Sequence, residues 1–166
     1  MDSKETVVLV TYDDPAKAFE NFDSLKESNV YDNLRIHEMV VVENKDGQIQ
    51  VPPSYESGSD EVERTAIGGI TGAIVGMLAG PVGVIVGAGL GLGSGMAVDD
   101  LDVDSEIKAL KHMSENLPAG QAALALVVTE KVEGALDELI IPDAIITRWP
   151  AIEVNAEMER VRELSK

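Results

Sequence analysis

The sequence predicts an α+β protein, and three observations support that prediction. Short β-branched, apolar segments alternate with segments in which apolar residues recur every three or four positions, the patterns of strands and amphipathic helices. The order strand-helix-strand occurs twice. Between these two halves, residues 65–98 have no charged side chain, although the whole chain has a formal net charge of −17. We therefore expect one small α+β domain that is interrupted by an apolar insertion.

The first half begins with a nearly continuous apolar run that is typical of a buried strand. Asp13-Asp14-Pro15 then supplies a capping residue and a proline suited to the first turn of a helix, in which Phe19, Phe22 and Leu25 share one face. Asp46-Gly47 is a strong turn signal. The expected elements are a strand at 6–12, a helix from 15 to about 28, a strand at 34–43, a short returning strand at 48–51 and a loop at 52–59.

The second half contains the same order after a helix that Asp104 can cap. Its expected elements are a helix at 105–116, a strand at 122–129, a short helix at 130–139, a strand from Ile140 or Ala144 to Arg148 that is interrupted at Pro142, and a C-terminal helix near 154–164. Without residues 52–117, the order is that of a ferredoxin-like βαβ-βαβ fold, an antiparallel sheet with helices on one face. The predicted division is a discontinuous domain of 1–58 and 99–150, an insertion of 59–98 and a C-terminal helix of 151–166.

The uncharged insertion holds 11 of the chain's 15 glycines, and their spacing is regular. Two i, i+4 series stand on either side of Gly80-Pro81, where the phase changes and a proline cannot continue a helix interior. The two series are Gly68, Gly72, Gly76, Gly80 and Gly83, Gly87, Gly91, Gly95. Glycine costs a helix up to ~1 kcal/mol per residue relative to alanine, so close backbone packing along these stripes must offset the cost. We interpret the segment as a glycine-zipper helical hairpin.

The second arm of this hairpin has another series of small residues on its opposite side. Ile85, Gly89, Gly93 and Ala97 each lie two residues, or about 200°, from a member of the main stripe. One face can pack on the first arm, and the other is then free for a second copy of the protein. The hairpin is therefore predicted to mediate self-association, with Gly89 and Gly93 added to the eight stripe glycines as its contact residues.

The surroundings of the hairpin stay open between a lipid bilayer and the apolar core of a homo-oligomer or filament. Each arm has about 15–17 residues, which is short of the roughly 20 that span a bilayer. Acidic residues flank the block on both sides and give no orientation signal. Burial inside a single copy is the less favoured alternative, because roughly 100 remaining residues surround such a hairpin poorly. A flexible linker is disfavoured by the regular spacing.

The composition excludes several classes of protein. There is no cysteine, so a disulfide framework, a zinc-thiolate site and a cysteine nucleophile are ruled out. The 30 acidic against 13 basic residues repel phosphates, so we expect no nucleic-acid partner. The N-terminus has no secretory signal pattern, which predicts a cytoplasmic or cytoplasmic-membrane-associated protein and not a secreted one.

No arrangement of polar residues indicates catalysis, so we expect no enzyme activity, no cofactor and no metal. Asp100-x-Asp102-x-Asp104-x-Glu106 resembles half of a calcium loop, but Ser105 replaces the required glycine and Lys111 the closing glutamate. Both nucleotide-binding glycine fingerprints fail in the insertion. Four other candidates are better explained by capping, packing or surface position than by chemistry: His37, His112, Tyr12-Asp13-Asp14 and Trp149-Pro150.

A family resemblance follows from the order of these motifs. The short first strand followed by Asp-Asp, the Val40-Val41-Val42 strand, the Asp-Gly turn, the glycine block around Gly80-Pro81, and Leu117-Pro118-Ala119-Gly120 before the third strand resemble a bacterial domain-of-unknown-function family. The resemblance covers about residues 5–148. That family is commonly labelled "predicted membrane protein", which implies membrane association but no catalytic residues.

The function predicted from the sequence is therefore non-enzymatic self-association. The partner is a second copy of the chain, and a bilayer contacted through residues 65–98 is a further expectation. The alternative is a soluble ligand-binding or regulatory module, since ferredoxin-like domains often pair through their sheets and bind small molecules.

Overall fold

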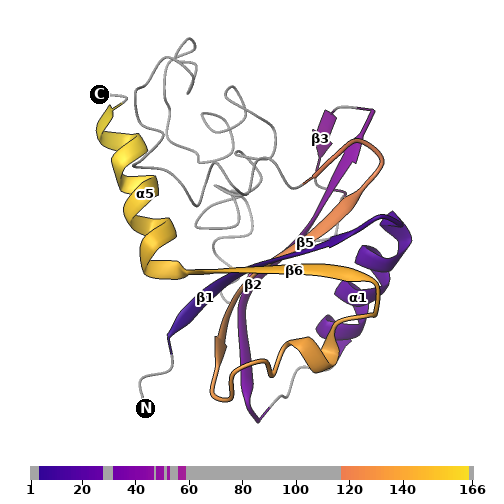
Figure 1. Ribbon diagram of the computed structural model, residues 1–166, viewed down its shortest axis with the longest axis horizontal. Helices are drawn as coiled ribbons and strands as arrows, with labels where there is room; N and C mark the ends of the chain where they lie inside the picture. The colour runs from indigo at the N-terminus through magenta and orange to yellow at the C-terminus, as the bar shows by residue number, and fades with distance from the viewer. Residues whose placement is uncertain are drawn as a thin grey trace.

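A computed structural model describes residues 4–27, 32–46, 48–50, 52, 56–58 and 117–164 of the chain. These residues form an antiparallel sheet with two α-helices, so the predicted α+β class is confirmed (Figure 1). The elements are β1 (Glu5–Tyr12), α1 (Pro15–Glu27), β2 (Leu34–Lys45), β3 (Gln48–Gln50), β4 (Glu56–Gly58), β5 (Ala122–Glu130), a 3₁₀ turn (Asp137–Leu139), β6 (Ala144–Pro150) and α5 (Ala151–Leu164). The expected hairpin and the helix at 105–116 lie outside the described residues.

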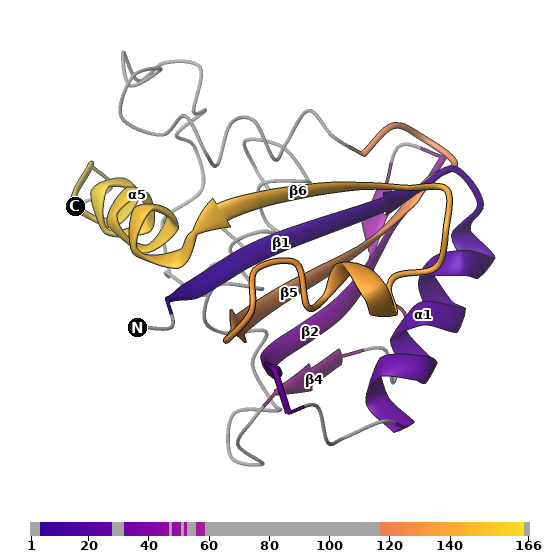
Figure 2. The same cartoon turned by 60° about the horizontal axis from the view of Figure 1, so that its bottom comes forward.

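The sheet has the strand order β3-β2-β5-β1-β6, and β4 also pairs with β2. All its strand pairs are antiparallel. β5 lies between β1 and β2, so a strand from the second half of the chain is inserted between the two long strands of the first half (Figure 2). Its burial reflects that central place, because seven successive residues from Ala122 to Val128 are buried on both faces of the sheet.

Alternation along the strands gives the sheet two apolar faces. We call the face that packs against α1 the first face; its core also includes Leu136 from the connection between β5 and β6. The main residues of this core are Val8, Val10, Tyr12, Phe22, Leu25, Met39, Val41, Leu124, Leu126 and Val128. The opposite, second face includes Val7, Leu9, Val40, Val42, Ala123, Ala125, Val127 and Trp149, all buried. α5 continues from the end of β6 and buries Ala151 and Val154.

The start of α1 follows the capping signal in the sequence. The Asp14 carboxylate accepts a hydrogen bond from the N–H of Ala16 at 3.0 Å, and Pro15 is the first residue of the helix. This satisfies an N–H group that has no partner within the helix. The buried residues Ala18, Phe22 and Leu25 recur at helical spacing and face the sheet. α1 therefore forms the connection between β1 and β2, and its buried face is the one that the periodicity predicts.

Two local expectations were wrong. Residues 131–136 form turns, and only Asp137–Leu139 are helical, as a 3₁₀ turn. The physical reason is Gly134, whose φ of +84° is incompatible with a right-handed helix. Residues 56–58 were expected in a loop but form β4 against β2. α5 begins directly after Pro150, at the first residue of the predicted C-terminal segment 151–166.

Candidate functional site

All ten glycines predicted to mediate self-association lie at 68–95, outside the described residues. The Asp100–Glu106 segment and His112 also lie outside them. The remaining sequence candidates, Tyr12, Asp13, Asp14, His37 and Trp149, are described and are placed below. The described residues contain no group of three or more His, Cys, Asp or Glu side chains that could hold a metal ion. No helix among them is both long enough and apolar enough to cross a membrane.

Tyr12 belongs to a buried polar cluster on the first face rather than to an open site. Its hydroxyl lies 2.6 Å from the Oδ1 of Asn21, a fully buried side chain of α1. The same Oδ1 accepts a hydrogen bond from the N–H of Ile141 at 2.9 Å, and the Nδ2 of Asn21 donates to the carbonyl of Leu139 at 3.0 Å. The carbonyl of Ile141 lies 3.1 Å from the Tyr12 hydroxyl. One asparagine thus joins β1, α1 and the connection before β6.

The sequence analysis did not single out Asn21. The signal that could have found it is positional, because Asn21 shares the inward face of α1 with Ala18, Phe22 and Leu25. A polar side chain on an otherwise apolar helix face must have hydrogen-bond partners once it is buried. The asparagine amide provides both a donor and an acceptor, which matches a connection that offers both a carbonyl and an N–H.

Burial raises the pKa of the Tyr12 hydroxyl to about 12 from its ordinary value of 10.0, against an opposing contribution from the hydrogen bond to the Ile141 carbonyl. The folded state therefore binds the phenolic proton more tightly than the unfolded state does. Stability from this proton is complete below pH 10.0 and is lost as the pH rises towards 12. We expect the free energy of unfolding to fall by about 2 kcal/mol over that window.

Urea unfolding of the protein and of a Tyr12→Phe variant, measured at intervals across the window, checks this expectation. The variant lacks the titrating hydroxyl and should lose stability less steeply than the wild type. Equal slopes for the two proteins would show that another group controls the alkaline transition.

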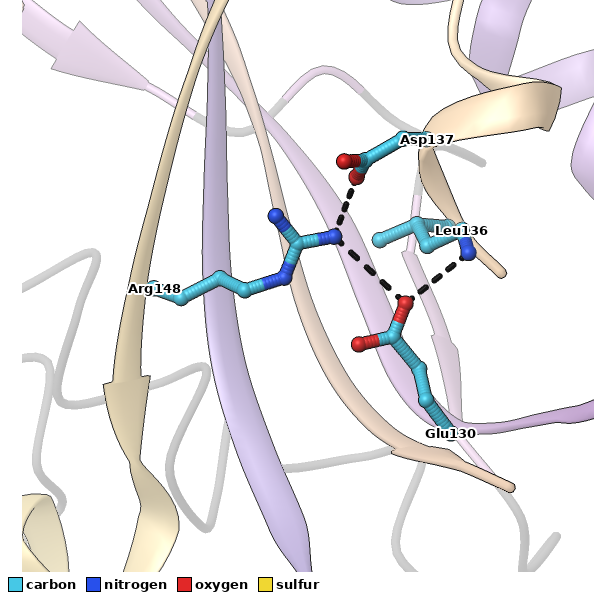
Figure 3. Close-up of polar contacts among 4 residues, drawn as sticks. All are labelled: Glu130, Leu136, Asp137 and Arg148. Atoms are coloured by element: carbon cyan, nitrogen blue, oxygen red, sulfur yellow. Dashed lines mark hydrogen bonds and ion pairs between the residues drawn. The ribbon is translucent and has the colours of Figure 1, made fainter. Parts of the chain in front are cut away.

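A second polar cluster lies where the connection between β5 and β6 returns to the sheet (Figure 3). The Nη2 of Arg148 on β6 bonds to the Oδ1 of Asp137 and lies 3.4 Å from the Oε1 of Glu130 at the end of β5. That Glu130 oxygen also accepts a hydrogen bond from the N–H of Leu136 at 2.9 Å. The Glu130 side chain is only 9% exposed, whereas that of Asp137 is 46% exposed. The cluster therefore attaches the connection to two strands, to β5 through Glu130 and to β6 through Arg148.

The charges of this cluster act on one another. Burial lowers the pKa of Arg148, but the bond to Asp137 and the charges of Glu130 and Asp137 outweigh it and raise that pKa above its ordinary value. The guanidinium stays protonated at any ordinary pH, and the carboxylates of Glu130 and Asp137 neutralise its positive charge. This arrangement orders the chain around Leu136, whose side chain is fully buried in the first-face core.

The other described candidates have structural partners. His37 sits at an irregularity of β2, and its Nε2 lies 2.8 Å from the Thr129 hydroxyl and 3.8 Å from a Glu5 carboxylate oxygen. Asp13 accepts a hydrogen bond from the Gln121 amide at 2.6 Å. Trp149 is 7% exposed on the second face, where it precedes the buried Ala151 of α5. The burial of Trp149 agrees with the packing position expected from the sequence, whereas the capping carboxylate of α1 is that of Asp14 and not of Asp13. The His37 side chain is 21% exposed and thus more buried than the surface position expected for it.

Residues 65–146 match a family described as "Protein of unknown function (DUF1269)". The expectation of a domain-of-unknown-function family is thus confirmed over that segment. The DUF1269 match begins inside the glycine-rich insertion and extends through β5 and the connection that Glu130 and Asp137 hold, into β6. No curated protein and no solved structure gave a significant match.

Proposed function

We propose that this chain is a non-enzymatic, self-associating protein whose glycine-rich segment 65–98 packs between copies. The observation that carries the proposal is the pair of i, i+4 glycine stripes in a segment without a single charge. Glycine stripes let two helix backbones approach closely, which is the main source of attraction between helices that lack a polar interface. The second small-residue face, at Gly89 and Gly93, provides the contact for another copy.

The described residues on either side of 59–116 lie beside the same strand, β2. Gly58 of β4 pairs with Glu38 of β2, and the Leu117 carbonyl accepts a hydrogen bond from the Asn44 side-chain amide of β2 at 2.9 Å. Glu38 and Asn44 are six residues apart on one strand, or about 20 Å. A two-arm excursion of 59–116 between these points is compatible with a helical hairpin.

The four main strands support a ferredoxin-like domain as the frame of this proposal. β2, β5, β1 and β6 are neighbours in that order, and each pair is antiparallel. Two βαβ halves that interlock through their central strands produce this order. The departure is in the second half, where the β5–β6 connection has turns and one 3₁₀ turn in place of an α-helix.

The test is to replace Gly87 and Gly91 together with leucine in the full chain and to measure its mass by sedimentation equilibrium. Leucine side chains would separate the backbones along the stripe, so the assembly is expected to dissociate towards the monomer mass. A Gly69→Leu variant, which changes a glycine outside the stripes, is the matched control and should keep the assembly. An unchanged mass for the double variant would remove the hairpin as the interface.

Cell fractionation distinguishes a hairpin that is inserted in a bilayer from one that is buried among copies of the protein. If residues 65–98 insert in a bilayer, the protein stays with membranes after a carbonate wash; if copies seal the segment among themselves, it is recovered in the wash. In the second case, salt should tighten the assembly, because it screens the repulsion between copies that each have a net charge of −17.

A further inference from the structure

The outer edge of β6 is the one long stretch of the described sheet that combines an unpaired strand side with exposed apolar side chains. Within the described part of the chain, β6 pairs on one side only, with β1. Ile145 on β6 is 70% exposed, and Ile152, in the first turn of α5, is 80% exposed. A free strand edge presents N–H and C=O groups that are ready to pair with another strand, and natural proteins usually protect such an edge with charge.

The β6 edge lacks the acidic side chains that are frequent elsewhere in the chain. Residues 144–152 include no acidic residue in a protein that has 30 of them. Their single charged side chain, Arg148, is bound to Glu130 and Asp137 on the first face and does not protect the edge. Two copies that carry −17 each repel one another over most of their surfaces, so an acid-free strip is where they can approach at the least electrostatic cost.

We propose that β6 pairs with β6 of a second copy, antiparallel and about a two-fold axis, so that one sheet runs through both copies. Pairing about the central residue, Thr147, sets Thr147 opposite its own counterpart and Ile145 opposite Trp149 of the second copy. Ile145 lies on the second face, because its β1 partner is Thr11, and Trp149 lies on the same face. The pairing thus sets the exposed Ile145 beside the strand position of Trp149 and links the edge N–H and C=O groups by hydrogen bonds.

This interface uses no residue of 59–116 and goes beyond the self-association proposed for the hairpin. A two-fold interface joins two copies and no more, since both copies use the same strip. Joined to a second interface through the hairpin, it extends the assembly from pairs to a chain of pairs. The two interfaces are independent in the sequence and can be removed one at a time.

Cross-linking tests the pairing directly, because the protein has no cysteine of its own. A Thr147→Cys variant of the full chain is oxidised and run on a non-reducing gel. Directly opposed residues in antiparallel strands have Cβ atoms about 4.5–5.5 Å apart, close enough for a disulfide to form with small adjustments. A covalent dimer is expected for this variant and not for Val132→Cys, a matched position that is 55% exposed but lies outside β6. Equal yields from both variants, or no dimer from either, would overturn the proposal.

A charge placed on the edge gives a second readout. Ile145→Glu adds an acid to the acid-free strip at an exposed position that the fold tolerates, and it should weaken the pair at least about tenfold in sedimentation. Val132→Glu should leave the mass unchanged; if Ile145→Glu also does, the edge is not the interface.

The Thr147→Cys dimer should persist when Gly87 and Gly91 are leucine. If it persists while the glycine changes have no effect on mass, the β6 pairing stands and the hairpin proposal fails.

Discussion

Replacing Asn21 with alanine is expected to lower the free energy of unfolding by about 3 kcal/mol or more. The reason is the number of polar groups that lose a partner: the part-buried Leu139 carbonyl and Ile141 N–H and the buried Tyr12 hydroxyl all bond to this one amide. An unsatisfied buried polar group costs about 1–3 kcal/mol. The Tyr12 hydroxyl can turn to the Ile141 carbonyl at 3.1 Å, so two of the three groups are left without a partner.

Urea denaturation measures this loss, and Ser24→Ala is the matched control because Ser24 is an exposed residue of the same helix. The control should change the free energy of unfolding by less than about 0.5 kcal/mol. Asn21→Asp separates the two functions of the amide: it keeps an acceptor for Ile141 but gives up the donor to Leu139 and buries a charge. If Asn21→Ala were as stable as Ser24→Ala, the connection would be held by its apolar contacts and not by this cluster.

The strands and the first helix were predictable because their signals are local. β1 is one apolar β-branched run, Asp14 and Pro15 mark the start of α1, and Val40 to Val42 lie in the middle of β2. These residues have the same preference in isolation as in the fold. The strand order, with β5 between β1 and β2, is not a local property, because it depends on pairing between the two halves of the chain.

The connection between β5 and β6 was not predictable in the same way. Residues 130–139 have helix-favouring composition, but Gly134 takes a left-handed conformation and the polar side chains bond to residues distant in sequence. Asn21 is 118 residues from Leu139, and Arg148 is 18 residues from Glu130. Hydrogen bonds to residues distant in sequence stabilise the conformation there, and they cannot be inferred from the local sequence of the connection. The same holds for β4, whose pairing depends on the exposed edge of β2.

The second large effect is expected from Arg148→Met, which should destabilise the protein by about 2–3 kcal/mol. Removing the guanidinium leaves the Glu130 carboxylate, only 9% exposed, without its cation. Breaking a fully buried pair costs about 3–5 kcal/mol, and the value here is lower because the Arg148 side chain is 30% exposed and water screens the site. Methionine keeps most of the length of the arginine side chain, so lost packing contributes little.

Glu130→Gln in the same chain should restore most of that loss. Glutamine removes the uncompensated charge, and its carbonyl oxygen can still accept the hydrogen bond that Leu136 donates to Glu130 at 2.9 Å. The coupling energy from the four unfolding measurements of a double-mutant cycle then isolates the ion pair from the N–H bond. Asp137→Asn alone should cost less than Arg148→Met, because the Asp137 carboxylate is 46% exposed and water can replace its partner. If the double variant is no more stable than Arg148→Met, Arg148 stabilises the connection by packing, and the charge of Glu130 is irrelevant to it.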